Sequence, residues 1–296
     1  MYLSYSGYKI VTACLLAYWH KYINRTTVPR DEDRLGSIYG SAVGELFEAF
    51  YNEELWRDPN CQEILEKRAP DVVDAVIKKE TTPTDWHPAG ILLWRGEGEG
   101  QNPKGLYLDR DELVGHVVST VASGIQSIRE FCLVSTQSKA EVQLDAIVDG
   151  HKLVGRADFV IENRVRHGDN VIIDGKGTRH NTKFLDPRQL KWYSMLYREH
   201  KGKAPDRSAF LLWQLEPPLN IHWYDFSDKD LDNFKAEVLK VVQDIEERKA
   251  RLSNRPSVEE VFEEFVPKPS HDNCRWCIYA TEKYCPKGYK VNRKGK

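Results

Sequence analysis

Two short apolar runs, each carrying one aspartate, constrain this chain more than any other feature. Asp158 lies in the first run, Leu153–Ile161, and Asp174 lies in the second, Val171–Lys176. The polar turn Glu162–Asp169 between the runs (ENRVRHGD) is typical of a hairpin connection. The pattern therefore predicts two neighbouring antiparallel strands, each with a carboxylate among its apolar side chains.

A symmetric hairpin would have its centre at Arg166, midway between the two aspartates. Asp158 and Asp174 would then face each other with Cα atoms about 5 Å apart. Lys176 follows Asp174 by two residues, so its side chain should emerge on the same face. An ordinary cross-strand Asp–Lys pair on the surface is the alternative. An uncompensated carboxylate within an apolar run is costly, which favours a functional pair.

Two carboxylates with a lysine beside them are typical of a divalent-metal site. Mg²⁺ or Mn²⁺ prefers oxygen ligands, and the carbonyl of Gly175 between the acid and the lysine offers another. Such a metal lowers the pKa of bound water and neutralises charge in a phosphoryl transition state. An ammonium group near the attacking water stabilises the developing charge. The pattern predicts phosphodiester cleavage by Asp158, Asp174 and Lys176.

The next segment reads as a helix over Arg188–His200, after the start signal Asp186-Pro187. Gln189 and Tyr193 are four residues apart and share one helical face. They would hold a phosphate, a metal-bound water or the catalytic lysine by hydrogen bonds. The alternative is that Tyr193 only packs and Gln189 is solvated.

Basic residues gather between the acid–lysine motif and this helix. The net charge of the chain is −2, so DNA binding would require the cations to be clustered. The candidate DNA-binding residues are Arg179, Lys183, Arg188 and Lys191. A basic C-terminal tail, Lys287–Lys296, would serve solubility or DNA contact.

The motif GRADFV…IIDGKGT…QLKWY resembles the RecB-like branch of the PD-(D/E)XK nuclease superfamily. Asp158 matches the acid of the second motif, and Asp174 with Lys176 matches the acid-x-lysine of the third. Gln189 and Tyr193 match the trailing Q-x-x-x-Y. The resemblance implies an α/β, restriction-endonuclease-like core with a mixed central sheet flanked by helices. It also implies metal-dependent cleavage of DNA.

The resemblance also places a helix with a metal ligand before the sheet. Apolar spacing predicts that helix at Gly36–Tyr51. RecB-like relatives carry a histidine where this chain has Gly44, so the histidine is missing. Glu48 resembles the helix acid of phage-type exonucleases and is the first candidate ligand, with Glu45 second. Two solvated glutamates are the alternative.

The cysteines provide a second strong signal. Cys274, Cys277 and Cys285 have a spacing that suits soft-metal ligation, and three thiolates need a fourth ligand. Cys14 resembles the N-terminal cysteine of RecB-like nucleases with an iron–sulfur domain. That resemblance implies a 4Fe–4S cluster held by these four cysteines. Zinc is the alternative occupant, with Cys14 or His271 as the fourth ligand.

The opening residues lack a hydrophobic signal segment, since Lys9 and His20 interrupt them. No apolar run approaches the ~18 residues of a membrane span. We therefore expect a protein of a reducing cytoplasm, in a bacterial, archaeal or phage-infected cell, without disulfides.

We expect four parts along the chain. They are residues 1–51 with the first cysteine and core helix, 52–135 as a mostly helical insertion, 136–252 as the nuclease core, and 253–296 as the cysteine-rich iron–sulfur lobe and basic tail. The expected helices of the insertion are Glu53–Arg68, Val72–Lys79 and Asp109–Glu130. The remaining expected strands are Ala140–Val148, Ala209–Leu215 and Asn220–Phe226, followed by a helix at Asp228–Leu252. The segment Ser253–Ser270 is expected to be a proline-containing connection.

The sequence thus predicts a Mg²⁺- or Mn²⁺-dependent DNA nuclease, an exonuclease on single strands or DNA ends. The resemblance implies a role in recombination, repair or CRISPR-type DNA processing, with a recombination or CRISPR-adaptation protein as partner. The chain contains no G-x-x-x-x-G-K-[ST] phosphate loop, which argues against a helicase fusion. Two alternatives remain: a degenerate nuclease fold that binds DNA or a partner without cutting, and a redox protein.

Overall fold

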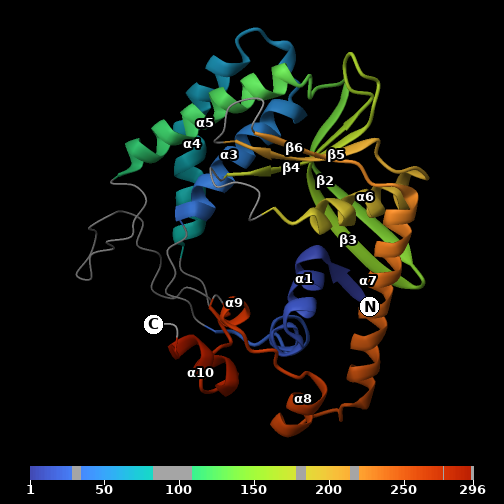
Figure 1. Cartoon of the computed structure of the whole chain (residues 1–296). Coiled ribbons are helices and arrows are strands. Elements are labelled where there is room, and N and C mark those ends of the chain that lie inside the picture. The colour runs from blue at the N-terminus through green and yellow to red at the C-terminus, as the bar shows by residue number, and fades with distance from the viewer. Residues whose placement is uncertain (29–34, 83–108, 178–184, 214–219, 276, 295–296) are drawn as a thin grey trace. The chain divides into compact units, whose positions relative to one another are not determined.

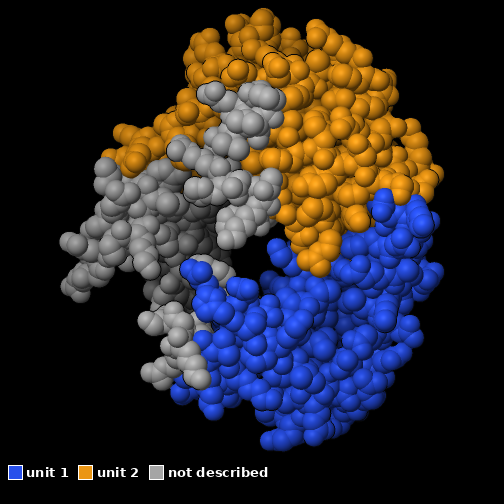
Figure 2. All heavy atoms as spheres, in the orientation of Figure 1, with its two compact units in different colours: residues 1–30, 145–155, 229–296 blue, residues 31–144, 156–228 orange. Residues whose placement is uncertain are grey.

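The computed structural model describes residues 1–28, 35–82, 109–177, 185–213, 220–275 and 277–294 (Figure 1). The chain forms two compact units, coloured separately in Figure 2. Unit 1 comprises residues 1–30, 145–155 and 229–296, and unit 2 comprises residues 31–144 and 156–228. The acid–lysine motif belongs to unit 2, and the four clustered cysteines belong to unit 1.

Three long helices of unit 2 pack against one another. They are α3 (Leu35–Asn52), α4 (Cys61–Thr81) and α5 (Arg110–Glu130), with a 3₁₀ turn, η2 (Leu55–Arg57), between the first two. Their apolar faces share one buried cluster with residues of the sheet. The first core helix therefore forms where its apolar spacing predicted.

Helix α4 corrects the prediction for the segment after α3. We expected two helices, Glu53–Arg68 and Val72–Lys79, but one continuous helix begins at Cys61 and includes Pro70. Proline removes a backbone hydrogen bond and usually ends a helix. Here a continuous buried stripe crosses the proline and outweighs that cost: Leu65, Ala69, Val73 and Val76.

A mixed sheet lies at the centre of unit 2 (Figure 1). Besides β1 (Tyr2–Ser4) of unit 1, its strands are β2 (Gln137–Val148), β3 (His151–Glu162), β4 (Val171–Lys176), β5 (Arg207–Leu212) and β6 (Ile221–Tyr224), where β2 and β3 extend into unit 1. β4 pairs antiparallel with β3 and parallel with β5, and β6 pairs antiparallel with β5. The last two residues of the expected strand Ala209–Leu215 lie outside the described residues.

Helices cover both faces of this sheet, because alternate residues of a strand point to opposite sides. Ala209 and Leu211 of β5 join the apolar cluster of α3, α4 and α5. Phe210 and Leu212 pack instead with Leu190 of α6 (Pro187–Lys201), the helix that connects β4 to β5. The α/β architecture with a mixed sheet between helices is the restriction-endonuclease-like fold class that the sequence predicted.

The β3–β4 hairpin has the predicted register. Its three paired positions are Phe159 with Ile173, Val160 with Ile172, and Ile161 with Val171, and each pair is equidistant from residue 166. Residue 166 lies in the turn with a φ of 68°, a conformation that turns often require. Extending the register by one residue brings the two aspartates level with each other.

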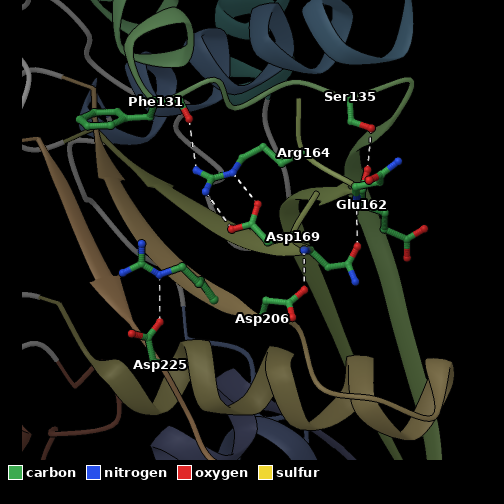
Figure 3. Close-up of polar contacts among 10 residues, drawn as sticks. Phe131, Ser135, Glu162, Arg164, Asp169, Asp206 and Asp225 are labelled. Atoms are coloured by element: carbon green, nitrogen blue, oxygen red, sulfur yellow. Dashed lines mark hydrogen bonds and ion pairs between the residues drawn. The ribbon is translucent and has the colours of Figure 1, made fainter. Parts of the chain in front are cut away.

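A buried arginine fixes the turn of this hairpin (Figure 3). Arg164 is only 5% exposed, and its Nε and Nη2 donate to the two carboxylate oxygens of Asp169 at 2.7 and 2.8 Å. Its Nη1 donates to the carbonyl oxygen of Phe131 at 3.2 Å, and the guanidinium lies over the Trp223 ring. These contacts tie the turn to the end of α5 and to β6, which stabilises the strand register.

Unit 1 combines the first and last parts of the chain with residues 145–155 of β2 and β3. It contains β1 (Tyr2–Ser4), α1 (Tyr5–Ala13), α2 (Leu15–Tyr18), a π-helix at Trp19–Ile23, α7 (Asp228–Arg251), α8 (Val258–Glu264), α9 (His271–Cys274) and α10 (Pro286–Lys294). β1 pairs in parallel with residues 152–154 of β3. Among the described residues, no helix is long and apolar enough to cross a membrane.

Helix α8 lies in the segment expected to be a connection. Ser257 and Glu260 form a reciprocal capping box, in which each side chain accepts a hydrogen bond from the other residue's backbone N–H. The Ser-x-x-Glu pattern is a sequence signal for a helix start. It was the signal that would have predicted α8.

Candidate active site

The backbone of Gly175, which follows Asp174 in the chain, links the two aspartates by a hydrogen bond to Asp158. Asp174 is 1% exposed near the end of β4, and the Gly175 N–H donates to Asp158 Oδ2 at 2.8 Å. Burial raises the pKa of both carboxyl groups, and the charge of Asp174 raises the pKa of Asp158 further. A buried and a half-buried acid whose ionised forms are unfavourable are suited to binding a cation.

Lys176 lies on the same side of β4 as Asp174, as the two-residue spacing predicted. Its Nζ forms an ion pair with Asp174 Oδ2 and donates to Gln189 Oε1 at 3.2 Å. The ammonium also lies 5.7 Å from the centre of the Phe210 ring. Contact with the ammonium lowers the pKa of Asp174 and so opposes the effect of burial.

Gln189 connects the acid, the lysine and the tyrosine. Its Nε2 donates to Asp174 Oδ1 at 2.7 Å and to the Tyr193 hydroxyl at 3.1 Å. Asp186 caps α6 by accepting from the Arg188 N–H, and a proline occupies the first turn, as the start signal predicted. Of the contacts predicted for Gln189, the structure shows the hydrogen bond to Lys176, and the hydrogen bond to Asp174 was not predicted.

A cavity of about 470 Å³ opens beside Asp158. Glu45 and Glu48 of α3 both line it, together with Gly44 and Gly175. Both candidate helix acids therefore lie on the same cavity as Asp158.

The donor set fits a hard divalent ion. Carboxylate oxygens and a backbone carbonyl are the ligands such ions prefer, and the glutamates of α3 line the same cavity. Within the described residues, however, no three His, Cys, Asp or Glu side chains lie close enough together to hold one ion. The metal ligands therefore stay a prediction.

Sequence reasoning missed several residues that line this cavity. Trp213 follows β5 and packs against Gly175, where a Cβ atom would lie 2.5 Å from the indole nitrogen. Glu141 of β2 and Arg156 of β3 also line it. Arg156 lies in the motif GRADFV, two residues before Asp158. That two-residue spacing could have predicted that both side chains lie on the same face of the strand.

The candidate DNA-binding residues have local partners where they are described. Arg188 Nε lies 3.1 Å from Asp186 Oδ1 within the first turn of α6. The Lys191 ammonium lies over the Phe226 ring at 5.5 Å. Arg179 and Lys183 lie outside the described residues. DNA contact by these four residues remains a prediction.

In unit 1, the four clustered cysteines line a single small cavity of about 20 Å³. Cys14 lies between α1 and α2, Cys274 ends α9, and Cys285 precedes α10. All six cysteines of the chain are free thiols. The cavity therefore brings together one thiol from the start of the chain and three from its end.

The thiols are close enough to influence one another. Burial raises the pKa of the Cys277 thiol to about 11, and the charges of the other three cysteines add to this rise. A Cβ on Gly288 would lie 3.1 Å from Cys285 Sγ and 3.3 Å from Cys274 Sγ, so glycine leaves room beside two sulfurs. Four converging thiols fit a soft metal or an iron–sulfur cluster, although the ligand geometry is not formed among the described residues.

A family model described as the PD-(D/E)XK nuclease superfamily matches residues 2–286. The chain belongs to this superfamily. Its members generally use divalent metals, which agrees with the oxygen-rich donor set beside Asp158. The match extends from β1 through the last of the four clustered cysteines.

Two crystal structures resemble this superfamily member at low identity. One, from Eubacterium rectale, carries the name "putative exonuclease"; it is 17% identical, with a TM-score of 0.42, over 82% of this chain and 80% of that one. The other, named SSO0001, is 15% identical, with a TM-score of 0.28, over 56% of this chain and 72% of that one. No curated protein matches the chain.

Proposed function

We propose that this protein is a Mg²⁺- or Mn²⁺-dependent deoxyribonuclease that acts on single-stranded DNA or DNA ends. The observation that carries the proposal is the connected set of Asp158, Gly175, Asp174 and Lys176 beside a cavity of unit 2. Membership of a nuclease superfamily supports hydrolysis of phosphodiester bonds. The DNA substrate and the choice of metal are part of the proposal.

Each residue of the site has a role in this proposal. Asp158, Asp174 and the Gly175 carbonyl would hold the metal, with Glu48, or else Glu45, contributing from α3. The bound metal would activate a water and neutralise charge on the phosphate. Lys176 would stabilise the charge that develops during attack. Gln189 and Tyr193 hold the lysine and Asp174 in place.

We also propose that Cys14, Cys274, Cys277 and Cys285 hold a structural 4Fe–4S cluster, with zinc as the alternative occupant. Their shared cavity supports this assignment. Four thiolate ligands are what such a cluster requires. A role in recombination, repair or CRISPR-type DNA processing, together with a protein partner from that pathway, completes the proposal.

Cleavage of end-labelled DNA tests the nuclease assignment. Single- and double-stranded substrates are incubated with Mg²⁺ or Mn²⁺ and with wild type, Lys176→Ala or Lys201→Ala protein. Lys201 is a matched control, because it also forms an ion pair with a carboxylate, that of Glu162 at 3.0 Å, whereas the partner of Lys176 is Asp174. We expect cleavage by wild type and the control but not by Lys176→Ala. Equal cleavage by all three would refute the site, and none by wild type would favour a non-cutting DNA-binding module.

Anaerobic purification tests the cluster. We expect broad absorption near ~400 nm and iron on elemental analysis. Cys277→Ala should lose the absorption and lower the unfolding temperature, whereas Cys132→Ala, outside the cysteine cavity, should retain the absorption. If elemental analysis finds stoichiometric zinc and no iron, the four cysteines hold zinc and not a cluster. A fully coloured Cys277→Ala protein would contradict the ligand set.

A further inference from the structure

The described lining of the cavity beside Asp158 includes two cations, Lys79 and Arg156. Lys79 lies near the end of α4, whereas Arg156 lies on β3, two residues before Asp158. The side chains of Arg156 and Asp158 therefore emerge on the same face of the strand. The Arg156 side chain is 67% exposed, so a ligand in the cavity can reach it.

Glu141 holds Arg156 in this position. The Arg156 Nε lies 2.8 Å from Glu141 Oε2, across the β2–β3 pair. Glu141 has a φ of 52° within β2, in the left-handed region that non-glycine residues rarely adopt. Such outliers gather at functional sites, where the surrounding structure enforces them. Glu141 and Asp158 line the same cavity, so this anchor lies on the same cavity as the acid.

The anchored guanidinium is suited to a phosphate. An arginine carries five N–H donors in a planar fork, and a contact through Nε leaves the outer edge of the fork to a ligand. That edge matches two oxygens of one phosphate. Apart from the paired Glu141, the cavity is lined by carboxylates that repel a DNA backbone: Glu45, Glu48 and Asp158. A cation on the same cavity reduces this repulsion.

We propose that Arg156 binds a backbone phosphate of the substrate next to the scissile one, and that Glu141 is the positioning residue that aims it. This inference rests on the proposed nuclease function, because it places a DNA strand in the cavity beside Asp158. The alternative is an exposed ion pair that only stabilises the β2–β3 pair, and such pairs contribute little.

Binding of a single-stranded oligonucleotide at several salt concentrations tests this role. Fluorescence anisotropy is measured in the Lys176→Ala background, so that the oligonucleotide stays intact. We expect Arg156→Ala to weaken binding about tenfold or more. It should also lower the slope of log affinity against log salt by about 0.7, the share of one phosphate contact on a single strand. Arg156→Lys should keep the slope but recover only part of the affinity, because it lacks the planar fork.

Arg68→Ala is the matched control, since Arg68 also pairs with a glutamate, Glu53, at 2.8 Å but lies outside the cavity lining. It should leave affinity and slope unchanged. Glu141→Gln should weaken binding in the same direction, and the double variant with Arg156→Ala should be no weaker than Arg156→Ala alone. Additive losses would show that Glu141 does not act through Arg156.

Steady-state cleavage by the otherwise wild-type enzyme completes the test. Arg156→Ala should raise KM by a similar factor and change kcat less, a division that a purely structural role would not produce. A folded Arg156→Ala protein with unchanged affinity, salt slope and KM would overturn the inference about Arg156. Cleavage by the wild-type enzyme would still support the nuclease assignment in that case. Failure of wild type to cleave would instead overturn the nuclease assignment, and the binding measurements would still decide the role of Arg156.

Discussion

Replacing Gly175 with alanine tests whether packing beneath the cavity fixes the acid–lysine motif. A Cβ at this position would lie 2.5 Å from Trp213 Nε1 and 2.7 Å from both Cε2 and Cζ2. Real Cβ atoms essentially never approach so closely, so something must move. The indole is 5% exposed, stacks on Phe47 with ring centres 4.2 Å apart, and meets the Phe159 ring edge-on at 5.8 Å. Because its neighbours hold the indole, β4 itself should shift.

The expected cost follows from overpacking of a filled core. Extra atoms in such a site destabilise by about 1–3 kcal/mol. Each kcal/mol corresponds to roughly 2–4 °C in Tm for a folding unit of this size, so a fall of about 2–12 °C is expected. Activity should fall further. The Gly175 N–H orients Asp158, and a displacement of about 1 Å at a catalytic group costs on the order of 100-fold in rate.

Thermal unfolding and the initial rate of DNA cleavage measure the two effects. Gly115→Ala is the matched control, because nothing lies within 4 Å of its added Cβ in α5. It should leave the rate unchanged and stabilise by roughly 0.5–1 kcal/mol. Adding Trp213→Phe to Gly175→Ala should recover part of the lost stability, since the smaller ring lacks the indole nitrogen. Wild-type Tm and rate in Gly175→Ala would refute the reasoning.

Three further outcomes are expected. Arg164→Ala should cost about 3 kcal/mol in urea unfolding, because it removes a buried guanidinium and leaves the Asp169 carboxylate, whose side chain is only 19% exposed, unpaired; loss of the more exposed Arg207 pair should cost about 1 kcal/mol or less. Without metal, the free energy of unfolding should fall as pH rises above the ordinary carboxyl pKa of about 3.9, because Asp158 and Asp174 have raised pKa values and keep their protons longer in the folded state than in the unfolded state. Asp158→Asn should flatten this fall in thermal unfolding with EDTA. An unchanged pH profile would show that Asp158 is not its cause. Glu48→Gln should raise the Mn²⁺ concentration for half-maximal cleavage at least tenfold and Glu45→Gln should raise it less; the reverse order would make Glu45 the ligand.

The hairpin was predictable because its determinants are local. Apolar alternation defines the two strands, and the length of the polar turn defines their register, so the pairing about Arg166 followed from spacing alone. The helix after Asp186-Pro187 was predictable for the same reason, since its cap lies in adjacent residues. Local patterns also placed Gln189 and Tyr193 on one face of the helix. They did not predict which of several partners Gln189 contacts.

The features that the sequence did not predict depend on distant segments. Pro70 lies within a helix because residues on both sides of it are buried against α3 and α5, and a local propensity contains no such information. Trp213 meets Gly175 only after β5 has paired with β4. The conformation of Glu141 and its contact with Arg156 likewise require that β2 and β3 first pair.

Gly175 lies at the point where these local and distant determinants meet. Its N–H orients one acid, it joins the other acid to the lysine along the chain, and its missing side chain admits Trp213. Asp174 is held separately, by Lys176 and Gln189. Both carboxylates are therefore oriented by protein groups before a metal binds. These two carboxylates would need less ordering when the proposed metal binds, so more of the binding energy would remain for the reaction.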